Sequence, residues 1–494
     1  MTHEDADFHV GIIGAGFGGL VAAMRLQRQG YSFVIFERAL ELGGTWRDNT
    51  YPGCACDVAS QLYSFADEPN PDWSQRYSPQ GEILAYLKHV AEKRDLIRHI
   101  RFGTDVTEAR FSPNGTWTLH DRQGGRTRVR FLIMASGPLN RPIMPDLKNA
   151  SEFQGVYFHS SQWRHDVDLT GKKVAVIGTG ASAIQIIPAI APRVRHLTVV
   201  QRTPPWVFFR HDTRTTNFWK HLFRQVPGAQ RLVREATFWY YELVGRGFMG
   251  NQLIQQILQT LGRWQLRSQI KNVELRKKLS PTFQVGCKRI LRSDDYYPVF
   301  NRPNVTLVNE PFDRFTPMGW ATASGKLFDA DVVVFATGFE AAEVNLYLKV
   351  YGLEGHELLE EWQRNSPEVH RGCTVSGYPN LALLLGPNTG LGHNSVVHIM
   401  ESQMNYVMDY LHQLKVNRAA YFDVELSAQR AYNEKLQRQF RGTVWLSGCK
   451  SWYLNDRGRN TTLFPRSNTA FRRQTRKVNL GEYRTSTYQQ QSNT

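Results

Sequence analysis

The sequence predicts an α/β protein, because the pattern strand, glycine-rich turn, helix, strand occurs twice, at residues 8–37 and 174–202. Each repeat is followed by an apolar run that ends in a small residue and glycine, at 131–137 and 332–338. A chain of 494 residues is long enough for two or three domains with sizeable cores. We therefore expect two Rossmann-like dinucleotide-binding domains, each built on a mainly parallel sheet.

The first repeat carries the pattern G-x-G-x-x-G at Gly14, Gly16 and Gly19, between a strand-like run and a helix-like segment. The first glycine permits the tight turn, the second lets the backbone approach a pyrophosphate, and the third lets helix and strand pack closely. Glu37 ends the next strand, where its carboxylate can accept hydrogen bonds from ribose hydroxyls. These residues predict an FAD site; the alternative is a glycine-rich turn without a ligand.

The second repeat ends its pattern in alanine, with Gly178, Gly180 and Ala183. Arg202, followed by Thr203, stands where the first repeat has Glu37. A carboxylate would repel a 2′-phosphate, whereas arginine pairs with it and a threonine hydroxyl can donate to it. This site is therefore predicted to prefer NADPH over NADH, unless Arg202 is an ordinary surface cation.

The second repeat lies inside the first along the chain, which predicts interleaved domains. The expected order is an FAD-binding part, an NADPH-binding part, a helical insert, the rest of the NADPH-binding domain, the rest of the FAD-binding domain and a disordered tail. The corresponding boundaries are 1–140, 141–205, 206–286, 287–338, 339–480 and 481–494. The insert is aromatic, basic and rich in helix formers, and suggests several short helices, whereas the tail is rich in Ser, Thr and Gln.

The formal net charge is +16, and it is unevenly distributed: residues 206–286 hold thirteen Lys and Arg against four Asp and Glu. Such an insert could favour nucleic acid or an anionic membrane surface. We prefer a solvated basic surface beside an anionic cofactor and expect no nucleic-acid partner, with weak membrane-surface association as the alternative. The sequence contains no apolar run long enough to span a membrane.

Five cysteines are spread sparsely over the chain, at Cys54, Cys56, Cys287, Cys373 and Cys449. This odd number predicts free thiols and a reducing compartment such as the cytoplasm. No His or Cys cluster has the spacing of zinc ligands, so we expect no metal.

Sites for FAD and NADPH together are typical of disulfide reductases and of flavin monooxygenases. A reductase needs a redox-active cysteine pair near the flavin, and the only close pair is Cys54 and Cys56. One intervening residue would make a strained redox disulfide, so we interpret both as small residues lining a cofactor loop. A monooxygenase is therefore the preferred class.

The segment Phe153–Trp163 reads F-x-G-x-x-x-H-x-x-x-W and resembles the signature of type I Baeyer–Villiger monooxygenases, which are class B flavin-dependent monooxygenases. It lies just before the second glycine-rich turn, as in that family. The family usually has Pro or Asp after the tryptophan, whereas this chain has Arg164. His159 in this segment is interpreted as a structural or hinge residue in an interdomain linker.

Further motifs resemble the same family between Gly14 and Trp452. They are the loop Gly43-Gly44-Thr45-Trp46 with Tyr51-Pro52-Gly53 and Asp57, the pair Lys288-Arg289, the turn at Gly386-Pro387-Asn388, and Trp452 in Ser451-Trp452-Tyr453. The resemblance implies that Gly44, Thr45, Trp46 and Gly386 contact the flavin cofactor. It also implies that Lys288 reaches the 2′-phosphate beside Arg202 and Thr203.

The resemblance further implies an oxidation of ketones to esters or lactones with NADPH, FAD and O₂, through a flavin C4a-peroxide and a Criegee adduct. Arg289 would stabilise the anionic peroxide, Asp57 would orient Arg289, and Trp452 would contact the nicotinamide–ribose region or the substrate. Sulfides are possible additional substrates. The alternatives are a structural Asp57–Arg289 salt bridge, an N- or S-oxygenating flavin monooxygenase, and a non-catalytic flavoprotein module.

Overall fold

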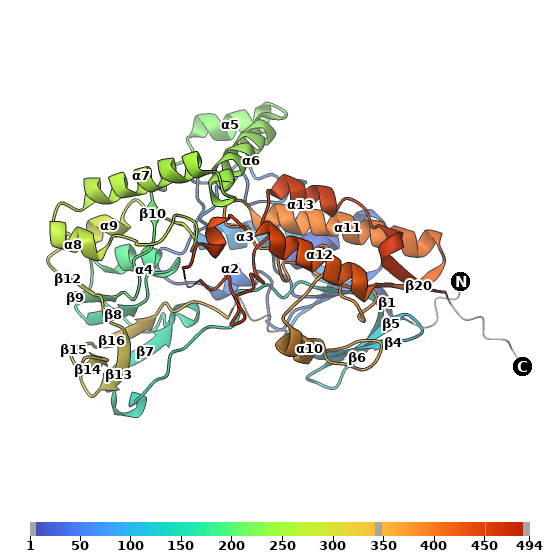
Figure 1. Ribbon diagram of the computed structural model, residues 1–494, viewed down its shortest axis with the longest axis horizontal. Helices are drawn as coiled ribbons and strands as arrows, with labels where there is room; N and C mark the ends of the chain where they lie inside the picture. The colour runs from blue at the N-terminus through green and yellow to red at the C-terminus, as the bar shows by residue number, and fades with distance from the viewer. Residues whose placement is uncertain (1–5, 341–347, 450, 488–494) are drawn as a thin grey trace, which may run out of the picture.

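The computed structural model describes residues 6–340, 348–449 and 451–487, and these residues form two large sheets and three smaller ones (Figure 1). The sheet of the first repeat has the order β17-β4-β5-β6-β1-β2-β3, with β18 beside β6. Its strands are β1 (Phe8–Ile13), β2 (Phe33–Phe36), β3 (Ile100–Arg101), β4 (Val106–Ser112), β5 (Thr116–Asp121), β6 (Arg126–Met134), β17 (Lys349–Tyr351) and β18 (Leu381–Leu383). The pairs of β1 with β2 and β6, and of β18 with β6, are parallel.

The sheet of the second repeat is parallel throughout and has the order β12-β9-β8-β16-β7. Its strands are β7 (Val156–His159), β8 (Lys173–Ile177), β9 (His196–Val200), β12 (Val305–Val308) and β16 (Val332–Phe335). An antiparallel sheet follows β12, with β13 (Phe312–Thr316), β14 (Gly319–Thr322) and β15 (Leu327–Asp329). The two α/β repeats predicted from the sequence are thereby confirmed. β6 and β16 join the sheets of their repeats, beside β1 and β8, but both lie in the interior of the sheet and do not close it.

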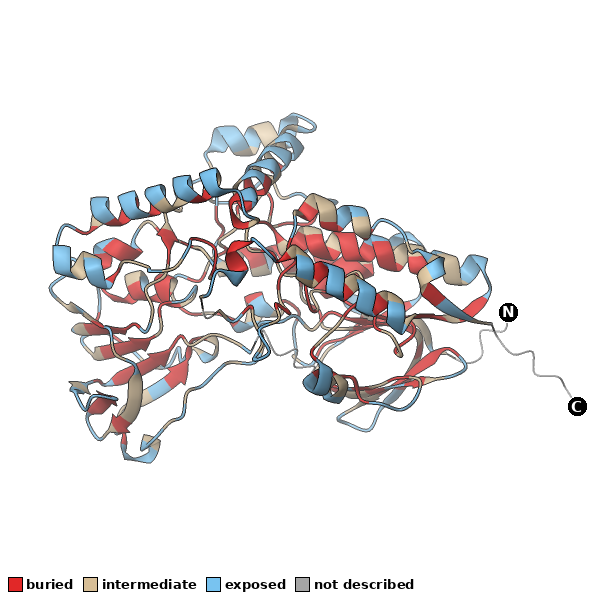
Figure 2. Ribbon diagram, in the orientation of Figure 1, coloured by how far each residue is buried: buried red, intermediate tan, exposed pale blue. Residues whose placement is uncertain are grey.

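Strand sequence explains why these sheets lie inside the protein. All four residues of β2, Phe-Val-Ile-Phe, are buried, and so are all four of β16, Val-Val-Val-Phe. Continuous apolar runs of β-branched and aromatic residues are typical of parallel strands covered on both faces. Figure 2 shows the buried residues concentrated in the sheets and in the helices next to them.

The helices that cover the sheets differ in length. They are α1 (Phe17–Arg28), α2 (Thr45–Asp48), α3 (Gln80–Lys93), α4 (Ala183–Ile190), α9 (Tyr296–Val299), α10 (Leu358–Asn365), α11 (Val396–Val416), α12 (Leu426–Gln439) and α13 (Asn468–Gln474). In α11, buried residues recur from Val397 to Leu411, where the helix packs beside α1. No helix in the described parts of the chain is long and apolar enough to cross a membrane.

The insert between the second repeat's strands differs from the expected set of short helices. It contains β10 (Val207–Phe208), α5 (Asn217–Gln225), α6 (Ala229–Phe248), α7 (Gln252–Gln269), α8 (Val273–Lys278) and β11 (Leu291–Arg292). The prediction of short helices is wrong for α6 and α7, which have 20 and 18 residues. These two helices pack on each other, and α7 also packs on β10 and on α9 (Figure 1).

The chain end also differs from the expectation of a disordered tail beginning at residue 481. Residues Tyr483–Thr487 form β20, which pairs antiparallel with β19 (Ala419–Val424). Tyr483 is buried and its hydroxyl lies 2.6 Å from that of Tyr406. The buried Tyr483 thus anchors the otherwise polar strand β20. The polar composition of the segment gave no sign of this contact. The remainder of the predicted tail, 488–494, lies outside the described residues.

Candidate active site

The first glycine-rich turn has no room for a side chain at Gly14 or at Gly19. Gly14 has a φ of +102°, and a Cβ there would lie 2.8 Å from the carbonyl oxygen of Ala135 at the end of β6. A Cβ on Gly19 would lie 1.9 Å from the carbonyl oxygen of Gly14. Helix α1 begins directly after Gly16, without a side-chain cap and without an acidic residue in its first turn. Its free N–H groups therefore suit a phosphate.

Glu37 lies beside this turn and is buried. Its carboxylate accepts hydrogen bonds from the N–H of Ala15 at 2.9 Å, the N–H of Ala39 at 3.0 Å and the Arg47 guanidinium at 3.0 Å. A carboxylate offers about four acceptor positions, so one is left for a ribose hydroxyl. The predicted role of Glu37 fits this geometry.

The loop that carries Gly44, Thr45 and Trp46 lies over the same turn. The N–H of Gly43 donates to the carbonyl oxygen of Ala15 at 3.0 Å, and a Cβ on Gly44 would lie 3.3 Å from the Cα of Gly16. The buried Trp46 ring donates to the Tyr63 hydroxyl at 3.2 Å.

Gly386 lies at a cavity next to the carboxyl end of β6. The lining includes Ser136 and Gly137 after β6, Leu384 and Gly386 after β18, and Thr461. Ligands of open α/β sheets bind outside the carboxyl ends of the strands. Gly386 therefore lies at the edge of the sheet where folds of this kind bind their ligands.

The second glycine-rich turn repeats the construction of the first. A Cβ on Gly178 would lie 2.5 Å from the carbonyl oxygen of Ala336 at the end of β16, just as Gly14 meets Ala135. Gly180 has no atom within 4 Å of such a Cβ, so the backbone there is open to a ligand. Helix α4 begins at the buried Ala183 without a side-chain cap. This turn also fits a pyrophosphate.

Cations gather beside this second turn. Arg202 is exposed, and Lys288, from a distant part of the chain, lies close enough to feel its charge. The carbonyl oxygen of Thr203 accepts a hydrogen bond from the Thr179 hydroxyl at 3.3 Å. Burial and the charge of Arg202 lower the pKa of Lys288. Two cations this close repel each other, and a bound phosphate would relieve that repulsion.

Asp57 and Arg289 form an ion pair, although 232 residues separate them. The Nη2 and Nε atoms of Arg289 donate to Oδ2 of Asp57 at 2.7 and 3.1 Å. Burial would raise the pKa of Asp57, but the charge and hydrogen bonds of Arg289 and the charge of Arg292 outweigh it, so the pKa is lowered. The Asp57 charge raises the pKa of Arg289. Arg289 keeps 40% of its side chain exposed, so this permanent cation remains accessible to a reacting group.

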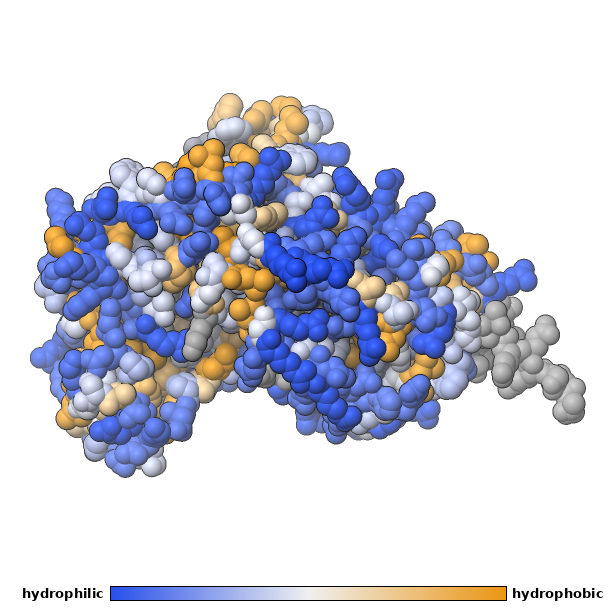
Figure 3. Space-filling model, in the orientation of Figure 1, coloured by the Kyte–Doolittle hydropathy of each residue, from blue (hydrophilic) through white to orange (hydrophobic). Residues whose placement is uncertain are grey.

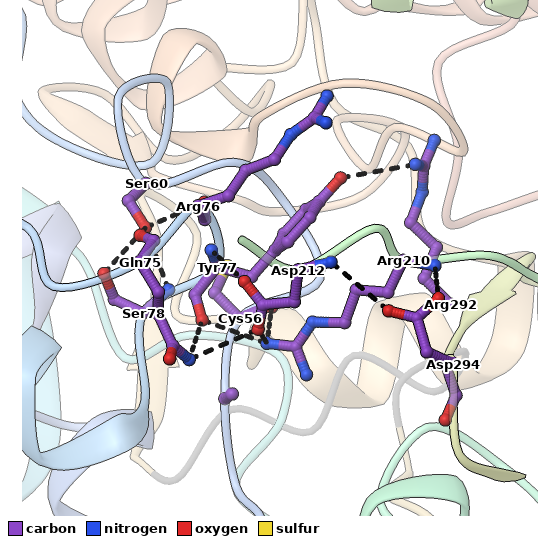
Figure 4. Close-up of polar contacts among 12 residues, drawn as sticks. Cys56, Ser60, Gln75, Arg76, Tyr77, Ser78, Arg210, Asp212, Arg292 and Asp294 are labelled. Carbon is purple, nitrogen blue, oxygen red and sulfur yellow. Dashed lines mark hydrogen bonds and ion pairs between the residues drawn. The ribbon is translucent and has the colours of Figure 1, made fainter. Parts of the chain in front are cut away.

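Several residues that sequence reasoning missed hold the loop of Asp57 (Figure 4). Arg210 donates to the carbonyl oxygens of Cys56 and Tyr77 at 3.3 and 3.0 Å, and Asp212 accepts from the Tyr77 N–H at 3.2 Å. Arg292 donates to the Tyr77 hydroxyl at 3.4 Å. These partners come from three segments far apart in the chain, so no motif spacing could reveal them.

Gln185 of α4 connects the Asp57 loop to the second sheet. Its side chain accepts from the Tyr51 hydroxyl at 3.0 Å and donates to the carbonyl oxygen of Ala55 at 2.9 Å. A Cβ on Gly53 would lie 2.6 Å from the Gln185 carbonyl oxygen. The Tyr-Pro-Gly sequence before Asp57 therefore docks one dinucleotide-binding unit against the other.

The expectation of five free thiols is wrong, because Cys287 and Cys449 form a disulfide. The bond joins residues 162 positions apart, with their Cα atoms 6.3 Å from each other, and sequence spacing carries no sign of it. It also removes the cysteine-based argument for a reducing compartment. Cys54, Cys56 and Cys373 are free and buried, and burial raises the pKa of Cys54 to about 11. Cys54 and Cys56 are therefore not joined as a redox disulfide.

This disulfide brings the Trp452 segment to Lys288 and Arg289. The Trp452 ring is 41% exposed and packs on the ring of Tyr453 at 4.5 Å between centroids. Tyr453 is buried, which raises the pKa of its hydroxyl to about 12, while the charge of Arg289 acts in the opposite direction. The disulfide, a hydrogen bond from the Ser447 hydroxyl to Cys287 at 3.3 Å and the proximity of Tyr453 to Arg289 together associate these two segments.

The signature segment has a structural character. His159 ends β7 inside the second sheet, which corrects its expected place in a linker, and burial lowers its pKa to about 4. A Cβ on Gly155 would lie 2.4 Å from the Asp331 carbonyl oxygen. Arg164 pairs with Asp166 at 2.5 Å on the surface, and both side chains are more than half exposed. The departure at Arg164 is therefore a local surface feature.

Comparison with known proteins agrees with this geometry. The model of the flavin-binding monooxygenase-like family matches residues 7–227. A Baeyer–Villiger monooxygenase of Streptomyces coelicolor is 43% identical, covering 97% of this chain and 93% of the relative, and one of Pseudomonas aeruginosa is 42% identical, covering 97% and 91%.

Solved structures of similar proteins have the same architecture. OTEMO in complex with FAD and NADP superposes with a TM-score of 0.87 at 27% identity, covering 98% of this chain and all of that one. A steroid monooxygenase bound to NADP gives 0.85 at 29% identity, covering 97% and 99%. The chain belongs to the Baeyer–Villiger monooxygenases.

Proposed function

We propose that this enzyme uses FAD and NADPH to insert one oxygen atom of O₂ beside the carbonyl of a small ketone, giving an ester or lactone. The observation that carries the proposal is the Asp57–Arg289 pair, held on a loop that contacts α4 of the second unit. The Arg289 side chain pairs with Asp57 and still keeps 40% of its surface exposed, so it can contact a bound ligand as well. We keep the cytoplasm as the proposed location, because NADPH is available there.

The two cofactors have separate binding residues in this proposal. Gly14, Gly16, Gly19 and Glu37 hold the adenosine diphosphate part of FAD, and Gly44, Thr45, Trp46 and Gly386 hold its flavin side. Gly178, Gly180 and Ala183 hold the pyrophosphate of NADPH, and Arg202, Thr203 and Lys288 hold its 2′-phosphate. We correspondingly divide the chain into the interleaved FAD and NADPH domains expected from the sequence.

A flavin held by these residues and reduced by NADPH would supply the two electrons with which one oxygen atom of O₂ enters the ester and the other leaves as water. Arg289 provides a positive charge that does not titrate, next to the place where negative charge develops. Asp57 fixes the direction of the guanidinium by accepting from two of its nitrogens. Trp452, on the disulfide-linked segment, contacts the nicotinamide–ribose region or the ketone and shields the site from water.

The test compares a cyclic ketone with a thioether under ¹⁸O₂. We expect one ¹⁸O in the ester per NADPH consumed. The variant Arg289→Met should lose ester formation at least about 100-fold while still oxidising NADPH to yield hydrogen peroxide. Arg164→Met is the matched control, since its guanidinium pairs with Asp166 on the surface, and it should keep its activity.

Two outcomes contradict this proposal. If Arg289→Met formed the ester as fast as the native enzyme, Arg289 would have no catalytic role and the Asp57–Arg289 pair would be a structural salt bridge. Oxidation of the thioether or an amine without any ketone turnover would favour an N- or S-oxygenating monooxygenase. Ester formation together with sulfoxide formation would instead widen the substrate range.

A further inference from the structure

Exposed large apolar side chains are concentrated on the helical insert. Among the described residues, 24 large hydrophobic side chains are exposed, and twelve of them lie between Phe218 and Val273. Figure 3 shows hydrophobic side chains gathered at the tip that carries α5 and α6. A contiguous exposed apolar region of this kind marks an interaction surface.

The exposed residues form stripes along two helices. On α6, Leu232, Trp239 and Leu243 are 73%, 57% and 53% exposed, at a spacing that keeps them on one side of the helix. On α7, Leu253 and Ile257, followed by Trp264, repeat the arrangement with 67%, 49% and 59% exposure. Helical periodicity therefore directs apolar side chains outward, whereas a helix of a globular protein normally turns them inward.

The inward side of α6 is already occupied by the rest of the protein. Glu242 accepts from Asn394, the N–H of Asn468 and the Thr469 hydroxyl at 3.0 to 3.1 Å. Arg234 donates to the carbonyl oxygens of Gln61 and Ser64, each at 2.9 Å. The helix is thus held firmly by its polar side, and its apolar side is left for a partner.

Exposed cations lie among the apolar stripes. Arg231, Arg246, Arg263, Arg267 and Lys271 are all exposed. Of the four acidic residues in 206–286, Glu242 is buried, Asp212 and Glu274 are paired with Arg210 and Lys277, and Glu235 of α6 is exposed. The surface therefore presents tryptophan, leucine and an excess of positive charge together.

We infer that this lipid-facing surface, formed by the outer sides of α5, α6 and α7, docks on an anionic phospholipid bilayer. Tryptophans are enriched at membrane–water interfaces, and amphipathic helices with basic residues lie in the plane of anionic membranes. A protein partner or a second copy would need to supply a matching acidic and apolar surface, whereas an anionic bilayer supplies negative headgroups and acyl chains together. The inference concerns location and goes beyond the proposed reaction.

The lipid-facing surface is mechanically connected to the candidate active site. Phe248, at the end of α6, is buried against Gly286, where a Cβ would lie 2.5 Å from its ring. Gly286 precedes Cys287, Lys288 and Arg289 in the chain. Helix α6 therefore connects the proposed membrane-binding surface to the segment of the chain that carries Arg289.

The test measures sedimentation of the purified flavoprotein with vesicles, which needs no turnover. We expect binding to vesicles that contain phosphatidylglycerol, weakened by salt, and little binding to pure phosphatidylcholine. Leu232→Ser with Leu253→Ser should lower the affinity on the order of 10-fold. The matched control is Met318→Ser with Leu327→Ser, because these residues, 66% and 70% exposed, lie on the antiparallel sheet away from the insert.

A second pair of variants tests the charge. Arg231→Gln, Arg263→Gln and Arg267→Gln together should lower the affinity for anionic vesicles on the order of 100-fold, at about 5-fold per cation. The control neutralises three exposed cations of α12, Arg430, Lys435 and Arg438, and should bind almost as the native enzyme does.

Three results would overturn the inference. These are no sedimentation with phosphatidylglycerol vesicles at low salt, equal loss of binding in the test and control variants, or concentration-dependent self-association that the leucine variant abolishes without any vesicle binding. The last result would assign the surface to a second copy of the chain. Failure of ketone oxidation would leave vesicle binding unaffected, so the two proposals fail separately.

Discussion

The disulfide between Cys287 and Cys449 allows a quantitative test, because it ties two segments of the candidate site together. Cys287 directly precedes Lys288 and Arg289, and Cys449 lies three residues before Trp452. The perturbation is the double variant Cys287→Ser, Cys449→Ser, or reduction of the native enzyme with a dithiol. Either change removes the link and leaves all other side chains in place.

The expected loss of stability follows from the length of the closed loop. For a sequence separation of 162, the chain-entropy relation gives about 5 kcal/mol at 25 °C. If all 494 residues unfold together, an unfolding entropy of about 2 cal/mol/K per residue gives about 1 kcal/mol/K for the whole chain. The melting temperature should therefore fall by about 5 °C, and the KM for NADPH should rise more than kcat falls, because Lys288 loses its anchor.

The assay is thermal unfolding of the native enzyme and the double variant, each with and without dithiothreitol. The reductant should lower the Tm of the native enzyme to that of the variant and leave the variant unchanged. Denatured, unreduced protein should show the three free thiols of Cys54, Cys56 and Cys373. Five titratable thiols, or a Tm insensitive to the reductant, would refute the reasoning.

Three other substitutions test the cofactor sites and the insert. Arg202→Ala should raise the KM for NADPH at least about 10-fold and leave that for NADH unchanged, as steady-state kinetics would measure. Gly19→Ala should yield protein with little bound flavin by absorbance, because its Cβ would lie 1.9 Å from the Gly14 carbonyl oxygen. Glu242 has a pKa lowered to about 2, because hydrogen bonds and the charge of His393 outweigh its burial. This lowered pKa means that the ionised Glu242 stabilises the folded protein by about 3 kcal/mol. The stabilisation is present above the unfolded pKa near 4.5 and is lost as the pH falls towards 2. Urea unfolding of the native enzyme and Glu242→Gln should therefore converge towards pH 2.

Each of these expectations has a clear contrary result. Equal effects of Arg202→Ala on NADPH and NADH would mean that the guanidinium does not contact a 2′-phosphate. Full flavin content in Gly19→Ala would show that the first turn can rearrange. If Glu242→Gln had the same free energy of unfolding as the native enzyme at pH 7, the hydrogen bonds that Glu242 of α6 accepts would contribute nothing to stability.

Much of the fold follows from local sequence. A strand, a glycine-rich turn and a helix are each specified by residues adjacent in the chain, so both repeats and the strands at 131–134 and 332–335 could be predicted. The spacing from Gly19 to Glu37 likewise lies within one repeat. The length of α6 and α7 and the strand at Tyr483–Thr487 could not be predicted, because packing against distant segments decides them.

By itself, the sequence determined that two dinucleotide-binding turns exist and that Glu37 and Arg202 distinguish them, because these features depend on neighbouring residues. Only the tertiary structure decided that Arg292, Tyr77 and Gln185 support the Asp57 loop and that Cys287 bonds to Cys449. It also decided that the apolar side of the insert helices faces outward. Contacts between residues more than a hundred positions apart depend on how the sheets and the insert pack, and spacing along the chain contains no record of that packing.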